Sequence, residues 1–193
     1  MTFRTASLIG LITLPLLIAL HQPGTAAPAG TLVAGAITQD TTWTLGGSPY
    51  YLQNEVTVFP GATLTIEPAV QVMQDDTNGV SGITIRGRLL AEGTAAQPIT
   101  FGRGPVTPGS HDYWPGLKFE GEPLTPIAGS LLDYVVIDHG GGPGSGSDGA
   151  IVLVYATLTV RHAQITNSDG DGILGNDAAA GGVAHISDTS FSG

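Results

Sequence analysis

The chain has 193 residues, with 29 Gly, 13 Pro, no Cys and 16 acidic against 6 basic side chains. This length predicts one domain, and the hydrophobic fraction of 41% excludes a disordered polar chain, which could not bury enough apolar surface to offset its ordering entropy. The absence of Cys excludes disulfide frameworks, thiol catalysis and Cys-ligated zinc sites.

Residues 1–29 have the pattern of a secretory signal peptide. Arg4 precedes an apolar run over residues 8–20, and small residues follow at 25–29. The alternative is a membrane-spanning helix, but the run has about 13 residues where ~20 are needed to cross the hydrocarbon. We therefore expect a protein that is secreted or held at the cell surface.

The exported part of the chain is strongly acidic. Removal of residues 1–29 leaves 5 basic and 16 acidic side chains, a net charge of −11. A polyanion such as nucleic acid would be repelled, so nucleic-acid binding is not expected. No later stretch is apolar for long enough to predict a membrane span after removal of the signal.

From Thr31 onward the sequence predicts short β-strands, because apolar and polar residues alternate over three to five positions between Gly, Pro, Asn and Asp. Residues 30–58 are expected to form an N-terminal cap with the first strands, since an uncovered end would expose free backbone groups. Residues 59–193 are expected to form the repeating coils.

Pairs of inward-pointing aliphatic or aromatic residues recur along the chain, at spacings of 19, 34 and 34 residues. These pairs are Leu64/Ile66, Ile83/Ile85, Leu117/Phe119 and Ile151/Leu153. Two further short strands between successive pairs give three strands per coil, and such coils stack into a solenoid with parallel strands about 4.8 Å apart. The alternative is an antiparallel sandwich, which favours two-residue hairpin turns.

Several segments carry a resemblance to a known family. They are VTVFPGATLTIEP (56–68), GRLLAEGT (87–94), QPITF (97–101), WPGLKF (114–119) and LDYVVI (132–137). Over about residues 40–193 the chain resembles the opening coils of bacterial secreted proteins with the pectin-lyase-like fold. The resemblance implies an all-β, right-handed parallel β-helix of about five or six coils. The family usually has Gly where this chain has Ala69.

The end of the sequence predicts that the chain is a fragment. Its last strands run to Phe191 and stop at Gly193, with no amphipathic helix or polar strand to cover the final coil. Members of the family include polysaccharide lyases, glycoside hydrolases, adhesins and proteins without known activity. Any catalytic residues would then lie beyond Gly193.

One set of charged residues is expected to form an outer column. Glu67, Arg86 and Glu120 each follow an inward residue of a repeated pair. A carboxylate beside a guanidinium could serve an active site, or the column could be an ordinary surface ladder of ion pairs.

Catalytic residues cannot be assigned from the sequence. Hydrolysis of a glycoside needs two carboxylates, but the column after the third strand contains only Asp138. A lyase would need Ca²⁺ and a Lys or Arg base, and Lys118 is expected to point outward between Thr84 and Val152. His139 could be a base oriented by Asp138, although adjacent side chains diverge if the strand continues.

Two loops are candidates for ligand binding. Tyr113 and Trp114 could stack on a sugar, or could pack against the coil. Asn167, Asp169 and Asp171 match the first half of a calcium loop, but Ala178 stands where the bidentate Glu would be. A weak Ca²⁺ site and an ordinary turn both remain open there.

The sequence therefore favours a non-catalytic β-helix scaffold that binds glycans or other surface molecules. The alternative is a polysaccharide lyase or glycoside hydrolase whose catalytic residues lie beyond Gly193.

Overall fold

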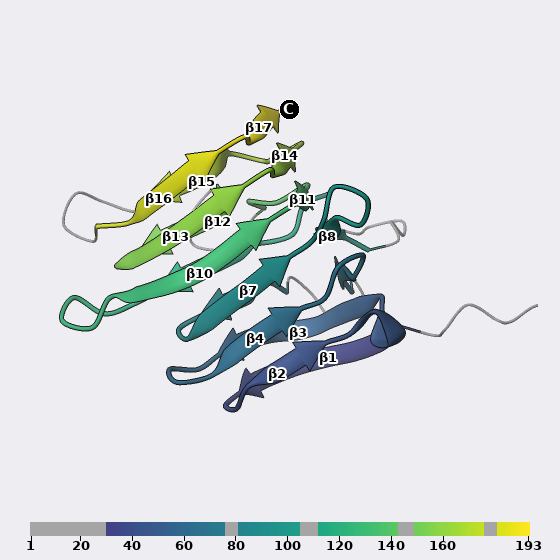
Figure 1. The fold of residues 1–193 in the computed structure, drawn as a ribbon, viewed down its shortest axis with the longest axis horizontal. Helices are drawn as coiled ribbons and strands as arrows, with labels where there is room; N and C mark the ends of the chain where they lie inside the picture. Colours follow the sequence, from purple (N-terminus) through teal and green to yellow (C-terminus); the bar gives the residue numbers. More distant parts are fainter. Residues whose placement is uncertain (1–29, 76–80, 105–111, 143–148, 176–180) are drawn as a thin grey trace, which may run out of the picture.

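The protein is an all-β parallel β-helix. The computed structural model describes residues 30–75, 81–104, 112–142, 149–175 and 181–193 (Figure 1). Within these ranges every pairing between two named strands is parallel, as the repeat predicts. The expected signal peptide lies outside the described residues.

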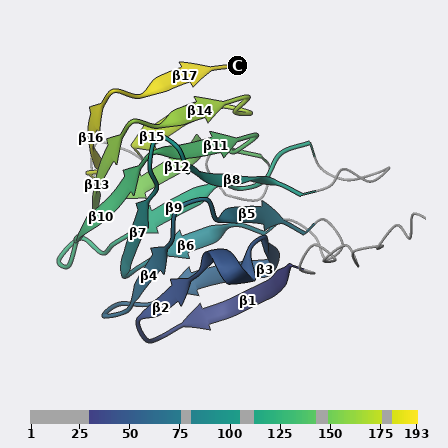
Figure 2. The same cartoon turned by 45° about the vertical axis from the view of Figure 1, so that its right-hand side comes forward.

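Each coil contributes strands to three faces (Figure 2). The first face contains β3 (Tyr50–Val58), β6 (Ile83–Ile85), β9 (Leu117–Glu120), β12 (Gly149–Val154) and β15 (Asp171–Gly175). The second contains β2 (Thr41–Trp43), β4 (Thr63–Ile66), β7 (Arg88–Glu92), β10 (Ile127–Asp133), β13 (Ala156–Arg161) and β16 (Val183–Ser187). The third contains β5 (Gln71–Gln74), β8 (Ile99–Arg103), β11 (Val135–Asp138), β14 (Gln164–Thr166) and β17 (Ser190–Ser192).

The long strand β3 joins the first and third faces into one sheet. Its first residues pair with β5 and its last residues pair with β6. The strand β1 (Thr31–Ile37) runs beside β3, and a 3₁₀ turn, η1 (Leu45–Gly47), separates β2 from β3. Residues 31–43 therefore continue both sheets as the first coil.

The inward side chains of the first face form a continuous column. Ile83 and Ile85 lie beside Leu117 and Phe119, and the next coil repeats this register with its own aliphatic pair. Burial is nearly complete along the column, with 1% exposure or less for each member. The predicted spacing of 34 residues is confirmed for these coils, because each coil presents the same two inward positions.

The pair Leu64/Ile66 belongs to a different face from the one expected. These residues lie in β4 and pair with β7, on the second face. The first-face partners of Ile83 and Ile85 are Val56 and Val58. The expected spacing of 19 residues was wrong because period-two alternation marks strands but does not mark the corner between β3 and β4.

Several corners between the second and third faces use a left-handed backbone. Ala69 has φ 64°, so this position is left-handed although it is not Gly. Tyr134, His162 and Asp188 take the same conformation one coil apart, with φ between 46° and 48°. One left-handed residue turns the chain sharply enough for the next strand to start on the adjacent face.

The final coil, like β1 at the other end, is more exposed than the coils between them. Val183, Ile186 and Phe191 are 47%, 47% and 50% exposed. Among the residues that the structure describes, there is no helix with the length and apolar character needed to cross a membrane.

Candidate functional site

Turns of unequal length connect the first face to the second. Residues 59–62 lead into β4, the two residues 86–87 lead into β7, and residues 121–126 lead into β10. Glu122 and Thr125 close the last turn with two backbone hydrogen bonds of 3.3 and 3.0 Å. In Figure 1 this turn projects at the left, beyond the turn that leads into β7. The short turn is therefore recessed between two longer ones.

This recess is a groove of about 690 Å³, which we call the notch. Arg86 and Arg88 lie along its floor, Pro60 lies on one side, and Glu122 and Thr125 lie on the other. Asp40 of the first coil also lines the notch, which thus combines hydrogen-bonding and apolar groups from four successive coils.

Gly87 keeps the floor of the notch low. A Cβ at this position would clash with the carbonyl oxygens of Phe59 and Ala62 in the turn beneath. Only a residue without a side chain lets the backbone of one coil approach the other so closely. The two-residue turn therefore depends on Gly87.

A group of three charges lies at the edge of the notch. Arg86 Nη2 is 2.7 Å from Glu120 Oε2, and Arg86 Nε donates to the same oxygen at 2.9 Å. Lys118 Nζ is 2.7 Å from Glu120 Oε1. The hydrogen bond from Lys118 lowers the pKa of Glu120, burial raises it, and Arg86 lowers it further, so the net pKa is below 4.5. Glu120 is thus an ionised bridge between two cations.

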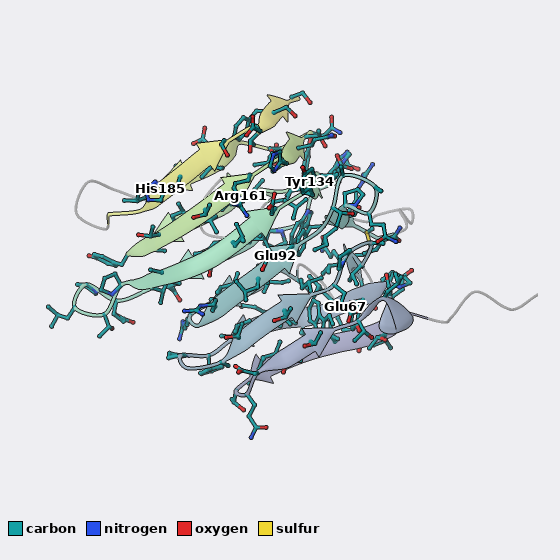
Figure 3. All side chains as sticks on the ribbon, viewed as in Figure 1. Glu67, Glu92, Tyr134, Arg161 and His185 are labelled. Carbon is teal, nitrogen blue, oxygen red and sulfur yellow. The ribbon has the colours of Figure 1, made fainter. Side chains whose placement is uncertain are left out.

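Only part of the expected outer column forms. Arg86 and Glu120 meet as predicted, and Lys118 lies between Thr84 and Val152 as predicted. Glu67 is not in this column, because it follows a strand of the second face. Its Oε2 instead accepts a hydrogen bond of 2.9 Å from the backbone N–H of Leu45. Figure 3 labels Glu67 near the end of β4.

Asp138 and His139 face one another across a corner after β11. The strand ends at Asp138, and His139 has φ 55°, which turns its ring back toward the carboxylate. His139 Nδ1 lies 2.7 Å from Asp138 Oδ2, a close electrostatic contact whose angle is too poor for a well-aligned hydrogen bond. Divergence of these side chains was expected only if the strand continued, and the strand ends at Asp138.

The next coil fixes the Asp138 carboxylate. Thr166 Oγ1 and Asn167 Nδ2 each donate to Asp138 Oδ1 at 2.8 Å. Burial raises the pKa of Asp138, but the hydrogen bonds from Asn167 and Thr166, together with His139, outweigh burial and lower the pKa below 3.8. This corner is therefore an anionic hydrogen-bond acceptor that joins two coils.

The two aromatic residues proposed for sugar stacking have different environments. Trp114 is 0% exposed, and its Nε1 donates to the carbonyl oxygen of Asp138 at 2.9 Å. Its ring therefore packs in the core and has no face open to a sugar. Tyr113 is half-buried, with its ring centroid 5.9 Å from that of His139. Sugar stacking by Tyr113 stays a prediction.

No described contact brings the three proposed calcium ligands, Asn167, Asp169 and Asp171, together. The Asn167 amide is bound to Asp138, while Asp169 and Asp171 are exposed. In the described ranges, no three His, Asp or Glu side chains are grouped so that they could hold a metal ion. A weak Ca²⁺ site at these residues stays a prediction, and Ala178 lies outside the described residues.

A second polar cluster, which was not predicted from the sequence, lies at the corner after β10 and β13. Asp133 Oδ2 accepts a hydrogen bond of 2.8 Å from Arg161, and Asp133 Oδ1 lies 2.9 Å from His162 Nδ1. The His162 ring stacks on Tyr134 with centroids 4.3 Å apart (Figure 3 labels Tyr134 and Arg161). Recognising this cluster requires the register of β10 on β13, which the bulge in β10 obscures.

Comparisons with protein-family models, with curated proteins and with solved structures found no match. The functional argument therefore depends on the fold and on the geometry of the notch.

Proposed function

We propose that this chain is a secreted or cell-surface β-helix scaffold that binds glycans without cleaving them, and that the notch is the binding site. The observation that carries the proposal is the notch itself, about 690 Å³ in volume and lined by residues from four coils. Small-ligand sites commonly have about 300–1,000 Å³, with apolar walls and a few polar groups.

The lining suits the two surfaces of a sugar ring. Pro60 and Ile127 offer apolar contact, while Thr63 and Thr125 offer hydrogen bonds to hydroxyl groups. A notch that crosses several coils can also hold more than one sugar unit. We further propose that the chain belongs with the bacterial pectin-lyase-like β-helix proteins, supported by the three-strand coils and the segments quoted above.

A non-catalytic role is favoured over a lyase by the position of Lys118. Its Nζ lies 2.7 Å from Glu120 Oε1, so it is engaged in an ion pair within the protein. A general base must lie within hydrogen-bond reach of the proton that it removes, and this pairing holds Lys118 against Glu120 instead.

A glycan array probed with the full protein tests the proposal. Ala128→Trp places a bulky side chain in the notch, and Ala36→Trp is the matched control at an exposed position of β1. We expect the wild type and Ala36→Trp to retain the same glycans, and Ala128→Trp to bind them at least about tenfold more weakly. Retention of no glycan by the wild type, or release of new reducing or unsaturated ends, would contradict the proposal.

A further inference from the structure

Arg88 is the one described cation that has no anionic partner. The other four described basic residues, Arg86, Arg103, Lys118 and Arg161, each pair with a carboxylate. In the part of the chain that the structure describes, the Arg88 side chain has neither an ion pair nor a hydrogen bond, although acidic residues outnumber basic ones 16 to 6. A guanidinium that is left free in so acidic a protein is available to a ligand.

The guanidinium of Arg88 has a defined position in the structure. Arg88 starts β7, and its guanidinium lies against Gly129, at the bulge of the neighbouring strand β10. A Cβ on Gly129 would lie 3.1, 3.2 and 3.4 Å from Nη2, Nε and Cζ of Arg88. The guanidinium therefore packs close to Gly129, where a side chain would crowd it, and the φ of 83° at Gly129 is a conformation that favours glycine. A planar fork held in this way suits a bidentate anionic group.

The charges around Arg88 limit how many anionic groups the ligand can carry. Glu122 and Asp40 also line the notch, and Arg86 is already neutralised by Glu120. With a net charge of −11 after removal of the signal peptide, the protein repels a polyanionic chain. A single anion beside Arg88 fits, whereas a row of anions would meet Glu122 or Asp40.

We propose that Arg88 binds the single carboxylate or sulfate substituent of a glycan that is otherwise neutral. This inference rests on the proposed function, since it names the class of sugar that the same notch takes. Arg88 supplies two parallel N–H donors to the anionic group, and the rest of the notch contacts the neutral sugar.

Calorimetric titration of the full protein with three small probes tests the inference. The probes are sialyllactose, which carries one carboxylate, sulfated lactose, which carries one sulfate, and lactose, which carries neither. We expect the wild type to bind at least one charged probe about tenfold more tightly than lactose. The comparison of the two charged probes shows which anion is preferred.

Three variants test whether Arg88 causes the preference for a charged probe. Arg88→Ala should lower the affinity for the charged probe about tenfold and leave the affinity for lactose unchanged, because only the anionic contact is lost. Arg88→Lys should give an intermediate affinity, since it keeps the charge and loses the planar fork. Arg103→Ala, which removes a cation paired with Asp112 instead, should bind like the wild type.

The outcomes separate this inference from the function on which it rests. Equal binding of lactose and the charged probes, with no effect of Arg88→Ala, overturns the role of Arg88 but leaves glycan binding standing. Much tighter binding of polygalacturonate than of a singly charged probe overturns the limit to one anion. If no sugar binds here and no glycan is retained on the array, both proposals fail.

Discussion

At the scale of single residues, backbone strain is concentrated at the corners between faces. Seven described residues other than Gly have positive φ, including Ala69, Tyr134 and His162. A Cβ in the left-handed region costs roughly 1–2 kcal/mol. Tyr134 and His162 offset this cost by stacking on one another, and His162 also contacts Asp133. Ala69 has only a methyl group with which to offset it.

Replacement of Ala69 by Gly should therefore stabilise the protein. The substitution removes the left-handed strain of roughly 1–2 kcal/mol, while the added freedom of the unfolded chain costs ~0.4–1 kcal/mol. We expect a net gain of about 0.5–1 kcal/mol in the free energy of unfolding, which corresponds to a rise of about 2 °C in Tm. Urea and thermal unfolding measure both quantities.

The control for this substitution is Ala36→Gly. Ala36 is exposed in β1 and does not have positive φ, so Gly there brings only the entropic cost. We expect it to lower stability by about 0.5–1 kcal/mol. Equal effects of the two substitutions would show that the strain at Ala69 is not relieved by Gly.

Asp138 should make stability depend on pH in the acid range. Its folded-state pKa is below 3.8, so the unfolded chain binds a proton more readily than the folded protein does. Its contribution is therefore complete above pH 3.8 and is lost as the pH falls through the lower, folded-state pKa. Asp138→Asn should cost about 1 kcal/mol near neutral pH, a modest figure because the carboxylate is about a third exposed and solvent screens it.

Urea unfolding of Asp138→Asn at several pH values tests this coupling. The difference from the wild type should shrink as the medium is acidified, because both proteins are then uncharged at this position. Asp112→Asn is the control, since the Asp112 side chain is 74% exposed and its ion pair among the described residues is with Arg103 at 3.2 Å. A difference for Asp138→Asn that stays constant with pH would refute an ionised Asp138 as its source.

At the scale of elements, the bulge in β10 shows how the ladder tolerates an irregular strand. The register of β10 on β13 shifts between Ile127 and Ser130. Ser130 is only 3% exposed, and its Oγ accepts a hydrogen bond of 3.1 Å from the backbone N–H of Leu89 in β7. A side-chain oxygen thus takes the place of a backbone carbonyl where the bulge interrupts the ladder.

Ser130→Ala should destabilise the protein by about 1–3 kcal/mol, because the buried N–H of Leu89 would lose its acceptor. The loss should appear as a lower urea midpoint with an unchanged slope. Ser190→Ala in the exposed strand β17 is the control and should change stability by less than about 0.5 kcal/mol. A neutral Ser130→Ala would mean that water or another group satisfies the Leu89 N–H.

The strands of the fold could be predicted from the sequence, but the corners could not. Ile83/Ile85 and Leu117/Phe119 were matched correctly, because period-two alternation and constant spacing are both visible in the sequence. Leu64/Ile66 was expected on the first face but lies on the second. The reason is that no residue pattern shows whether a turn leads to the next face of the same coil or to the same face of the next coil.

The candidate site was predictable where it depends on register alone. Arg86 and Glu120 are one coil apart at equivalent positions, and they pair as expected. Arg88 was not predicted as a site residue. Its place in the notch depends on the bulge at Gly129 and on the unequal lengths of the turns, and neither feature repeats along the sequence. The contact of Asp138 with His139 depends on a left-handed residue that is not Gly, which the sequence does not mark.

At the scale of the whole molecule, the coils form a one-dimensional stack in which the described strands pair with strands of the adjacent coils. In such a stack, stability is approximately a sum of the terms for each coil and for the interfaces between coils. Burial falls along the third-face column, from Phe101 at 0% exposure, through Ile165 at 1%, to Phe191 at 50%. The same kind of side chain should therefore contribute unequally at the two positions.

Truncation of the two phenylalanines measures this gradient. Phe101→Ala should cost about 3–5 kcal/mol, because it leaves a cavity among packed coils, whereas Phe191→Ala should cost about 1 kcal/mol or less, because its ring is already half in water. Each variant serves as the control for the other, since both lie in one column and lose the same atoms. Equal losses in urea unfolding would mean that the last coil is as well packed as the middle ones, and the linear account of stability would then fail for this protein.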